Sequence, residues 1–256
     1  MESEKYSWQG YLRQDGRCGI RNHILVIYTV KCSEFVARKI VENSDDLDVE
    51  LIGFDGCTDN QYAVNLLISM IRHPNVGAVL VVGLGCEGIQ AKDIADEIKT
   101  TGKPVEYIVI QEEGGTAKTV SKGVEIAGKM AREISKQNKV EFDISEIILG
   151  LECGGSDPTS GLASNPSIGV ASDMLVSMGG SSILSETTEV IGAEHLLYPR
   201  FEDENEGKKF LEMVKRVENR SIAAGHDLRE GQPTPGNKAG GLTTIEEKSL
   251  GCMHKA

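Results

Sequence analysis

Cysteines follow four of the apolar runs in this sequence, at the point where each run ends. Cys32 follows HILVIYTV, Cys57 follows ELIGF, Cys86 follows VGAVLVVGLG and Cys153 follows IILGL. Thiolates gathered in this way could bind a soft metal ion or an iron-sulfur cluster. The four cysteines lack the close spacing of a standard zinc or ferredoxin motif, so ordinary buried thiols remain the alternative.

Carboxylates occupy similar positions later in the chain. Glu152 directly follows the apolar run before Cys153, and Glu186 follows the run SSIL after one serine. Asp157 and the pair Glu194-His195 add further groups for acid-base chemistry or for binding a divalent ion. Each of these residues could instead have a structural role, such as a solvent-facing glutamate or a hydrogen-bonded core histidine.

The stretch GYLRQDGRCGIRN at residues 10–22 is rich in arginine. Arg13, Arg17 and Arg21 lie near Asn22 and could form a fork-like clamp for a carboxylate. The alternative is a solvated turn that leads into the next strand.

The elements that must position these groups are strands that alternate with helical patterns. This alternation is typical of an α/β protein with a mostly parallel open sheet and helices on both faces, a Rossmann-like arrangement. If all the strands share one sheet, their carboxyl ends lie along one edge, where we expect the chemistry. The predicted strands are 23–30, 50–54, 76–85, 105–110, 147–151 and 181–184.

The composition changes near residue 225. Residues 1–224 predict the α/β domain, including helical patterns at 189–197 and 201–224. Residues 225–256 are rich in Gly, Pro and Thr and predict an irregular segment, in which Lys238 stands among small residues. We expect this segment to lead into a C-terminal region that is missing here.

Bulk properties narrow the classes of partner. A net charge of -12 over 256 residues argues against nucleic acid or an anionic membrane as the main partner. A polar N-terminus, with no apolar run near the roughly 20 residues that span a bilayer, makes the cytoplasm the expected location. The six cysteines are then expected to be thiols or metal ligands rather than disulfides.

Several motifs together resemble the altronate and galactarate dehydratase family. They occur in the family's order across nearly the whole chain: GYLRQDGRCGIRN (10–22), TVKC (29–32), GLGCE (83–87), ECGGSD (152–157), LSET (184–187), GAEHLL (192–197) and PGNKAGGLTT (235–244).

The resemblance implies a lyase that removes water from a sugar acid to give a 2-keto-3-deoxy acid, with a divalent metal that is usually iron. A related branch, similar to sulfolactate sulfo-lyase, expels sulfite instead. The family's catalytic chain continues beyond the segment matched here, and many members carry or associate with a small β-rich domain. The resemblance therefore implies a fragment or one part of a split enzyme, with a possible small β-rich partner subunit.

One motif departs from the family pattern. Where members often have His-Gly-Thr-Gly-Cys, this chain has GFDGC at residues 53–57, which keeps Cys57 and loses the histidine. If that histidine binds metal in relatives, Asp55 would have to replace it or the site would differ.

The leading hypothesis is a cytoplasmic, homo-oligomeric hydro-lyase acting on an altronate-like hexonate. It uses Fe²⁺, with Mn²⁺ or an iron-sulfur cluster as alternatives. A base takes the proton beside the substrate carboxylate, and the metal stabilises the resulting charge. The expected base is Lys238 or His195, and Glu152 and Glu186 are expected to be metal ligands or proton carriers. The residues expected to hold the substrate are Arg13, Arg17, Arg21, Asn22, Ser156 and Asp157. The residues expected to bind iron are Cys57, Cys86 and Cys153.

Three other functions remain open. The chain could be a sulfo-lyase acting on sulfolactate, or a non-catalytic fragment that binds sugar acids without turnover. It could also be an iron-sulfur electron carrier, although the arginine-rich motif would then have no role.

Overall fold

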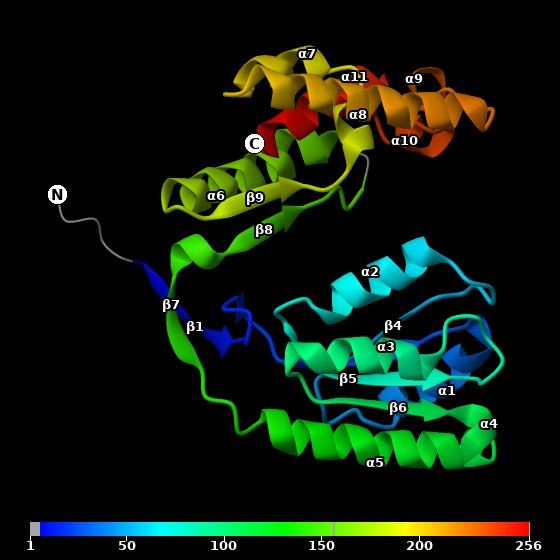
Figure 1. The fold of residues 1–256 in the computed structure, drawn as a ribbon. Helices are drawn as coiled ribbons and strands as arrows, with labels where there is room; N and C mark the ends of the chain where they lie inside the picture. The colour runs from blue at the N-terminus through cyan, green and yellow to red at the C-terminus, as the bar shows by residue number, and fades with distance from the viewer. Residues whose placement is uncertain (1–5, 156, 256) are drawn as a thin grey trace. The chain divides into compact units, whose positions relative to one another are not determined.

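The computed structural model describes residues 6–155 and 157–255 (Figure 1). The chain divides into two compact units. Residues 7–142 form the N-terminal unit, and the described residues from 143 onward, with Tyr6, form the C-terminal unit. This division differs from the boundary expected near residue 225, because the strands after residue 143 build a sheet of their own.

The N-terminal unit is built on a four-stranded parallel sheet in the order β4-β3-β5-β6. The central strand β5 has all eight of its residues buried, as a continuous run of Val, Leu and Gly predicts for a strand covered on both faces. Cross-strand neighbours such as Ile27 and Val81 fix the register. The strands are β3 (His23–Tyr28), β4 (Val49–Gly53), β5 (Val76–Gly83) and β6 (Val105–Val109).

Helices cover both faces of this sheet (Figure 1). Alternate strand residues point to opposite faces, so Ile27 packs with α2 and α3 in one apolar cluster and Val26 packs with α1 and α5 in another. The helices are α1 (Lys31–Glu42), α2 (Gln61–Ile71), α3 (Ala91–Ile98), α4 (Ile110–Glu113) and α5 (Thr116–Ile134), with a 3₁₀ turn at Lys99–Thr101.

The N-terminal unit also contains most of a small second sheet, in the order β2-β1-β7. β1 pairs antiparallel with β2, and the rings of Trp8 and Phe142 pack with centroids 5.5 Å apart. The strands are β1 (Ser7–Leu12), β2 (Cys18–Gly19) and β7 (Val140–Asp143).

The C-terminal unit has a two-stranded parallel sheet of β8 (Ile148–Leu151) and β9 (Ser181–Leu184), connected by α6 (Asn165–Ser177). This corrects the expectation that all six strand ends lie on one edge of one sheet. Among the described residues, β8 and β9 pair only with each other. Glu152, Cys153 and Glu186 therefore follow the strands of a different sheet from Cys57 and Cys86.

Helices and turns complete the C-terminal unit around a core that includes Ile191, Leu197 and Val214. The helices are α7 (Glu194–Leu197), α8 (Glu204–Ala223), α9 (Leu228–Gly231), α10 (Pro235–Ala239) and α11 (Ile245–Cys252). The other turns are Ile144–Glu146, Ser160–Ser164, Thr187–Val190, Tyr198–Arg200 and Met253–Lys255.

Two sequence predictions in this unit were wrong in detail. The helix expected at 189–197 is a 3₁₀ turn and a short α7, separated by Gly192, whose φ of 95° lies outside the helical region. Residues 225–255 are mostly helical rather than irregular. Asp227 and Thr244 accept N-cap hydrogen bonds, and Pro235 begins α10, so the polar and Pro residues of this segment mark helix starts.

Candidate functional site

In the N-terminal unit, three cysteines follow the carboxyl ends of neighbouring strands. Cys32 follows β3, Cys57 follows β4 and Cys86 follows β5, and all three are exposed. The amide of Gly88 donates to the carbonyl of Cys57 at 3.1 Å, which ties two of the loops together. The sequence therefore placed these thiols correctly on one edge of a parallel sheet, and their role as iron ligands stays a prediction.

A buried carboxylate shapes the loop that carries Cys86. Glu87 is 3% exposed and accepts hydrogen bonds from the Thr29 hydroxyl at 2.7 Å and from the amides of Leu84 and Gly85 at 2.9 and 2.6 Å. Burial alone would raise the pKa of Glu87, but the backbone and Thr29 hydrogen bonds outweigh it, and the net pKa is lowered. Glu87 therefore stays ionised, and the hydrogen bonds that its carboxylate accepts fix the conformation of the loop. The side chain of Cys86 is exposed to solvent.

The arginine-rich motif lies at the opposite, amino-terminal edge of the same sheet. Arg13 is 8% exposed and donates to the carbonyls of Pro74 and Arg21 and to the side chains of Asn22 and Gln137, at 2.6 to 3.2 Å. Its guanidinium therefore connects the segments that enter β3 and β5. A substrate-binding role for Arg13 and Asn22 remains a prediction, and the contacts present are structural.

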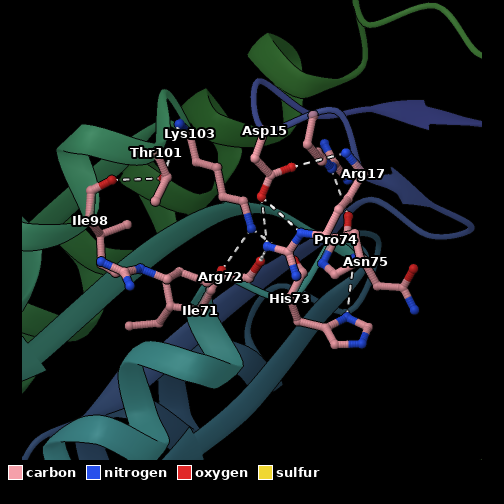
Figure 2. Close-up of polar contacts among 11 residues, drawn as sticks. Asp15, Arg17, Ile71, Arg72, His73, Pro74, Asn75, Ile98, Thr101 and Lys103 are labelled. Carbon is pink, nitrogen blue, oxygen red and sulfur yellow. Dashed lines mark hydrogen bonds and ion pairs between the residues drawn. The ribbon is translucent and has the colours of Figure 1, made fainter.

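Arg17 and Lys103 converge on the last carbonyls of α2 (Figure 2). Arg17 donates to the carbonyl of Arg72 at 2.7 Å and pairs with Asp15, and Lys103 donates to the carbonyls of Ile71 and His73 at 2.7 and 2.8 Å. Cations at this position satisfy carbonyls that have no partner within the helix. Burial, with the nearby charges of Arg13 and Arg17, lowers the pKa of Lys103 to about 8.

Arg21 differs from the other two arginines. Its side chain is exposed and lines an open cavity of about 300 Å³ with Asn22, Gln137 and Lys139. Arg17 is exposed as well, with a side-chain exposure of 51%, so two of the three arginines of the predicted clamp are accessible to solvent.

In the C-terminal unit, three acidic or thiol groups come together after β8 and β9. The ligand atoms of Cys153, Glu186 and Glu189 all lie within 4.8 Å of one another. The Ser185 hydroxyl and amide both donate to the carbonyl of Leu151, at 2.8 and 3.0 Å, which holds the two strand ends together. The sequence analysis named Cys153 and Glu186 as candidate site residues at the ends of strands, and it missed Glu189.

Glu189 forms a buried ion pair. Both carboxylate oxygens accept from the ammonium of Lys255, at 2.7 and 2.8 Å, and each side chain is 1% exposed. An ionised carboxylate has about four lone-pair sites, so these bonds leave capacity toward Cys153 and Glu186. Glu189 could have been suspected from its place three residues after Glu186, whereas nothing near Lys255 in the sequence signals a buried lysine.

Cys153 also lines a cavity of about 280 Å³. The lining includes Asp157, Lys248 and Cys252, so it offers a carboxylate, an ammonium group and two thiols. Burial and the charge of Glu189 raise the pKa of Cys252 to about 12, so this thiol stays protonated.

The other predicted groups of this unit lie outside the group formed by Cys153, Glu186 and Glu189. Glu152 is exposed, and Lys238 and His195 are exposed on α10 and α7. Glu194 pairs with Arg229 at 2.8 Å, which gives it a structural partner. Ser156 lies outside the described residues.

The donor set suits a divalent transition metal. One thiolate and two carboxylates combine a soft ligand with hard ones, a mixture that Fe²⁺ and Mn²⁺ accept. A second group, His23, Asp48 and Glu50, lies within the same 4.8 Å limit in the N-terminal unit. His23 is hydrogen-bonded to Asp48 at 2.7 Å, and the two carboxylates are exposed, so this group has a simpler reading as a surface ion pair.

Fold and site define an α/β protein with a cavity of about 280 Å³ next to a group of three possible metal ligands. Two family models match consecutive parts of the chain. "D-galactarate dehydratase/Altronate hydrolase, second domain" matches residues 10–135, and "D-galactarate/Altronate dehydratase, C-terminal" matches residues 144–256. The chain belongs to the galactarate and altronate dehydratase family, as the sequence motifs predicted.

Curated relatives agree with this assignment. Altronate dehydratase of Escherichia coli is 36% identical over 97% of this chain and 52% of its own length, and that of Bacillus subtilis is 32% identical over 99% and 53%. The (2R)-sulfolactate sulfo-lyase subunit beta of Chromohalobacter salexigens is 35% identical over 100% of this chain and 66% of its own length. The chain thus spans about half the length of the altronate dehydratases it matches.

Within the described part of the chain, each helix is too short or too polar to cross a bilayer.

Proposed function

We propose that this chain is the catalytic part of a hydro-lyase that dehydrates an altronate-like sugar acid to a 2-keto-3-deoxy acid. The observation that carries the proposal is the group formed by Cys153, Glu186 and Glu189, of which Cys153 lines a cavity. This group lies in the region that matches the dehydratase C-terminal model. The names of the altronate dehydratase relatives supply the substrate class.

Cys153, Glu186 and Glu189 would hold the metal, which we propose to be Fe²⁺, with Mn²⁺ as the alternative. When bound, the ion supplies a Lewis acid that stabilises negative charge on the substrate. Cys57 and Cys86 remain candidate iron ligands in the N-terminal unit, including for an iron-sulfur cluster. Iron analysis of Cys57→Ser, Cys86→Ser and Cys153→Ser variants decides which thiols retain iron.

The chain's own groups would bind the acid and move protons. The ammonium of Lys248 and the polar groups around Asp157 face the cavity and would hold the carboxylate and hydroxyls of the substrate. Arg21, with its exposed side chain, stays a second candidate for carboxylate binding. A base removes the proton beside the carboxylate, the neighbouring hydroxyl leaves as water after it is protonated, and the resulting enol becomes the ketone.

The candidates for the base remain Lys238 and His195. The side chains of both residues are exposed to solvent. Glu152 and Glu186 are candidates to carry the proton to the leaving hydroxyl. We expect Lys238→Met and His195→Asn to separate the two bases, because the variant that lacks the base should lose kcat with little change in KM.

The test is an anaerobic assay of iron-loaded protein on hexonates, hexarates and sulfolactate, with and without a small β-rich candidate partner. Appearance of a 2-keto-3-deoxy acid is the expected result. Glu186→Gln should lower kcat at least 100-fold, a typical effect of removing an acid-base group. Glu212→Gln on the exposed surface of α8 is the matched control and should keep wild-type kcat.

A sulfo-lyase is the second candidate, favoured by the sulfolactate sulfo-lyase relative. Release of sulfite from sulfolactate, without dehydration of hexonates, would assign the chain to that branch. That relative's name includes "subunit beta", which supports our proposal that this chain works with a companion subunit. That the chain is a homo-oligomer in the cytoplasm is a further part of the proposal, to be tested by sedimentation and by cell fractionation. Ligand-dependent stabilisation without any product would indicate a sugar-acid-binding module, and a redox-active visible spectrum without ligand binding would indicate an electron carrier.

A further inference from the structure

Asn165 differs from the other buried polar residues of this protein. It is 6% exposed, and among the residues that the structure describes its side chain has no hydrogen-bond partner. Every other buried polar or charged side chain in the same part of the chain forms at least one hydrogen bond, Arg13 and Glu87 among them. Buried polar groups are normally paired, so an unpaired one calls for a partner from outside the chain.

The usual structural reason for asparagine at a helix start does not apply to Asn165. The residue begins α6 after the turn at Ser160–Ser164, where asparagine commonly accepts a hydrogen bond from a nearby backbone amide. Within the described part of the chain, the Asn165 side chain accepts no such bond. Asparagine is also a poor helix former, so the fold gains little from this residue at this place.

The carboxamide of Asn165 reaches the cavity that Cys153 also lines. In the described residues, every fully buried side-chain nitrogen or oxygen has a partner, so the polar atoms of Asn165 must be accessible from this cavity. A Cβ built on Gly251 would lie 3.8 Å from Nδ2 of Asn165, which places the amide beside α11. Lys248 lies three residues before Gly251, on the same face of α11, and it lines the same cavity.

These two cavity groups favour one class of ligand. A carboxamide offers both a donor and an acceptor, and a hydroxyl group can pair with either. The ammonium of Lys248 forms no ion pair with a described residue and attracts a carboxylate. A hydroxy acid carries both groups. A ligand without the hydroxyl would leave the buried carboxamide unpaired, and binding sites reject such ligands strongly.

We propose that Asn165 is a specificity residue that binds a hydroxyl group of a hydroxy acid whose carboxylate is held by Lys248. This inference rests on the proposed function for the choice of a sugar acid as the ligand. It adds a residue that recognises the substrate to the groups that would hold the metal.

The experiment measures the binding of D-altronate and of its 2-deoxy and 3-deoxy analogues to the full chain by calorimetry. Iron is left out, and Zn²⁺ is added in a second series, so that a requirement for a divalent ion does not hide binding. We expect wild type to bind altronate at least tenfold more tightly than one of the two analogues. Asn165→Leu should bind altronate at least tenfold more weakly and should no longer distinguish it from that analogue.

A second variant and a control complete the design. Asn165→Asp keeps the shape and one acceptor but loses the donor, and it should also weaken altronate binding at least tenfold. Asn205→Leu is the matched control, because Asn205 lies in the first turn of α8 and is exposed, and it should bind all three ligands as wild type does. Asn165→Leu removes an unpaired amide, so its melting temperature should equal or exceed that of wild type.

The inference is overturned if both Asn165 variants bind altronate as tightly as wild type, or if Asn165→Leu still distinguishes the analogues. It is also overturned if wild type binds none of the three ligands, or if both variants melt well below wild type, as a purely structural residue would require. The anaerobic turnover assay judges the reaction separately. Turnover by wild type with unimpaired binding in Asn165→Leu refutes only this inference, whereas loss of binding in Asn165→Leu without turnover by wild type refutes only the proposed reaction.

Discussion

Glu189 and Lys255 show how a single buried pair can prepare an anionic site. The ammonium balances one carboxylate of a group that also contains Cys153 and Glu186. Without that balance, three acidic groups within 4.8 Å of one another would repel when ionised. The ammonium of Lys255 places a positive charge against Glu189 that opposes this repulsion.

Replacing Lys255 with Met should destabilise the C-terminal unit by about 3–5 kcal/mol, because it leaves a buried carboxylate without its partner. Urea unfolding followed by circular dichroism measures the loss. The double variant Lys255→Met/Glu189→Leu should recover most of it, since no charge is then left buried. Lys208→Met, which removes an exposed pair with Glu204, is the control and should cost less than about 1 kcal/mol. A similar small cost at Lys255 would contradict the account.

Glu87→Gln should destabilise the N-terminal unit by about 1–3 kcal/mol, because a neutral amide cannot accept all the bonds that the carboxylate accepts. The lowered pKa of Glu87 means that its contribution is present above its ordinary pKa of 4.5 and is lost as the pH falls through the folded value. The difference in unfolding free energy between wild type and variant should therefore shrink below pH 4.5. Glu112→Gln, at an exposed position, should show no such dependence.

At the scale of the elements, the arginine-rich motif and Lys103 hold the end of α2 and the entry to β5. Lys103, Arg17 and Arg13 donate to consecutive backbone carbonyls from Ile71 to Pro74. The spacing of arginines in the sequence suggested a clamp for a carboxylate. Arginine can donate hydrogen bonds either to a carboxylate or to a backbone carbonyl. Which acceptor an arginine meets depends on the backbone that the fold brings to it, and residue types do not reveal that.

Lys103 predicts an unusual pH dependence of stability. Its pKa is about 8 in the folded protein and about 10.5 when unfolded, so between these values the unfolded chain binds more protons. The unfolding free energy of wild type should therefore rise from pH 8 to pH 10.5 relative to that of Lys103→Met. Denaturant unfolding of both proteins at pH 7.5, 9 and 10 measures the difference. A difference that stays constant or falls over this range would contradict a buried, easily deprotonated lysine.

Individual strands and helices were predictable where one pattern dominated. β5 is a continuous apolar run and α1, α5 and α8 are amphipathic, so local physics decided their structure. The sheet to which a strand belongs was not predictable, because the short runs of β8 and β9 fit a shared sheet as well as a separate one. Lys255 and Cys252 were absent from the predicted site for a related reason, because the sequence does not reveal which distant segments the fold brings together.

At the scale of the whole molecule, the two units have separate cores. Both apolar clusters of the N-terminal unit fall within residues 24–134, and the core around Ile191 and Val214 lies in the C-terminal unit. Each unit therefore buries its own apolar side chains, which is the usual condition for independent folding.

Residues 7–142 produced alone should fold cooperatively, with a dispersed amide NMR spectrum and a single unfolding transition. Limited trypsin digestion of the full chain should cut first near Lys136 and Lys139, which are exposed between α5 and β7. A fragment without a cooperative transition would show that this unit depends on the rest of the chain.

The central claim is that the group of Cys153, Glu186 and Glu189 is the catalytic centre of a sugar-acid dehydratase. The most direct measurement is the anaerobic rate of 2-keto-3-deoxy acid formation by wild type, Cys153→Ser and the control Cys32→Ser, with bound iron quantified in each protein. We predict that Cys153→Ser loses both iron and turnover while Cys32→Ser keeps both. Unchanged iron content and rate in Cys153→Ser would contradict the claim and place the catalytic centre elsewhere in the chain.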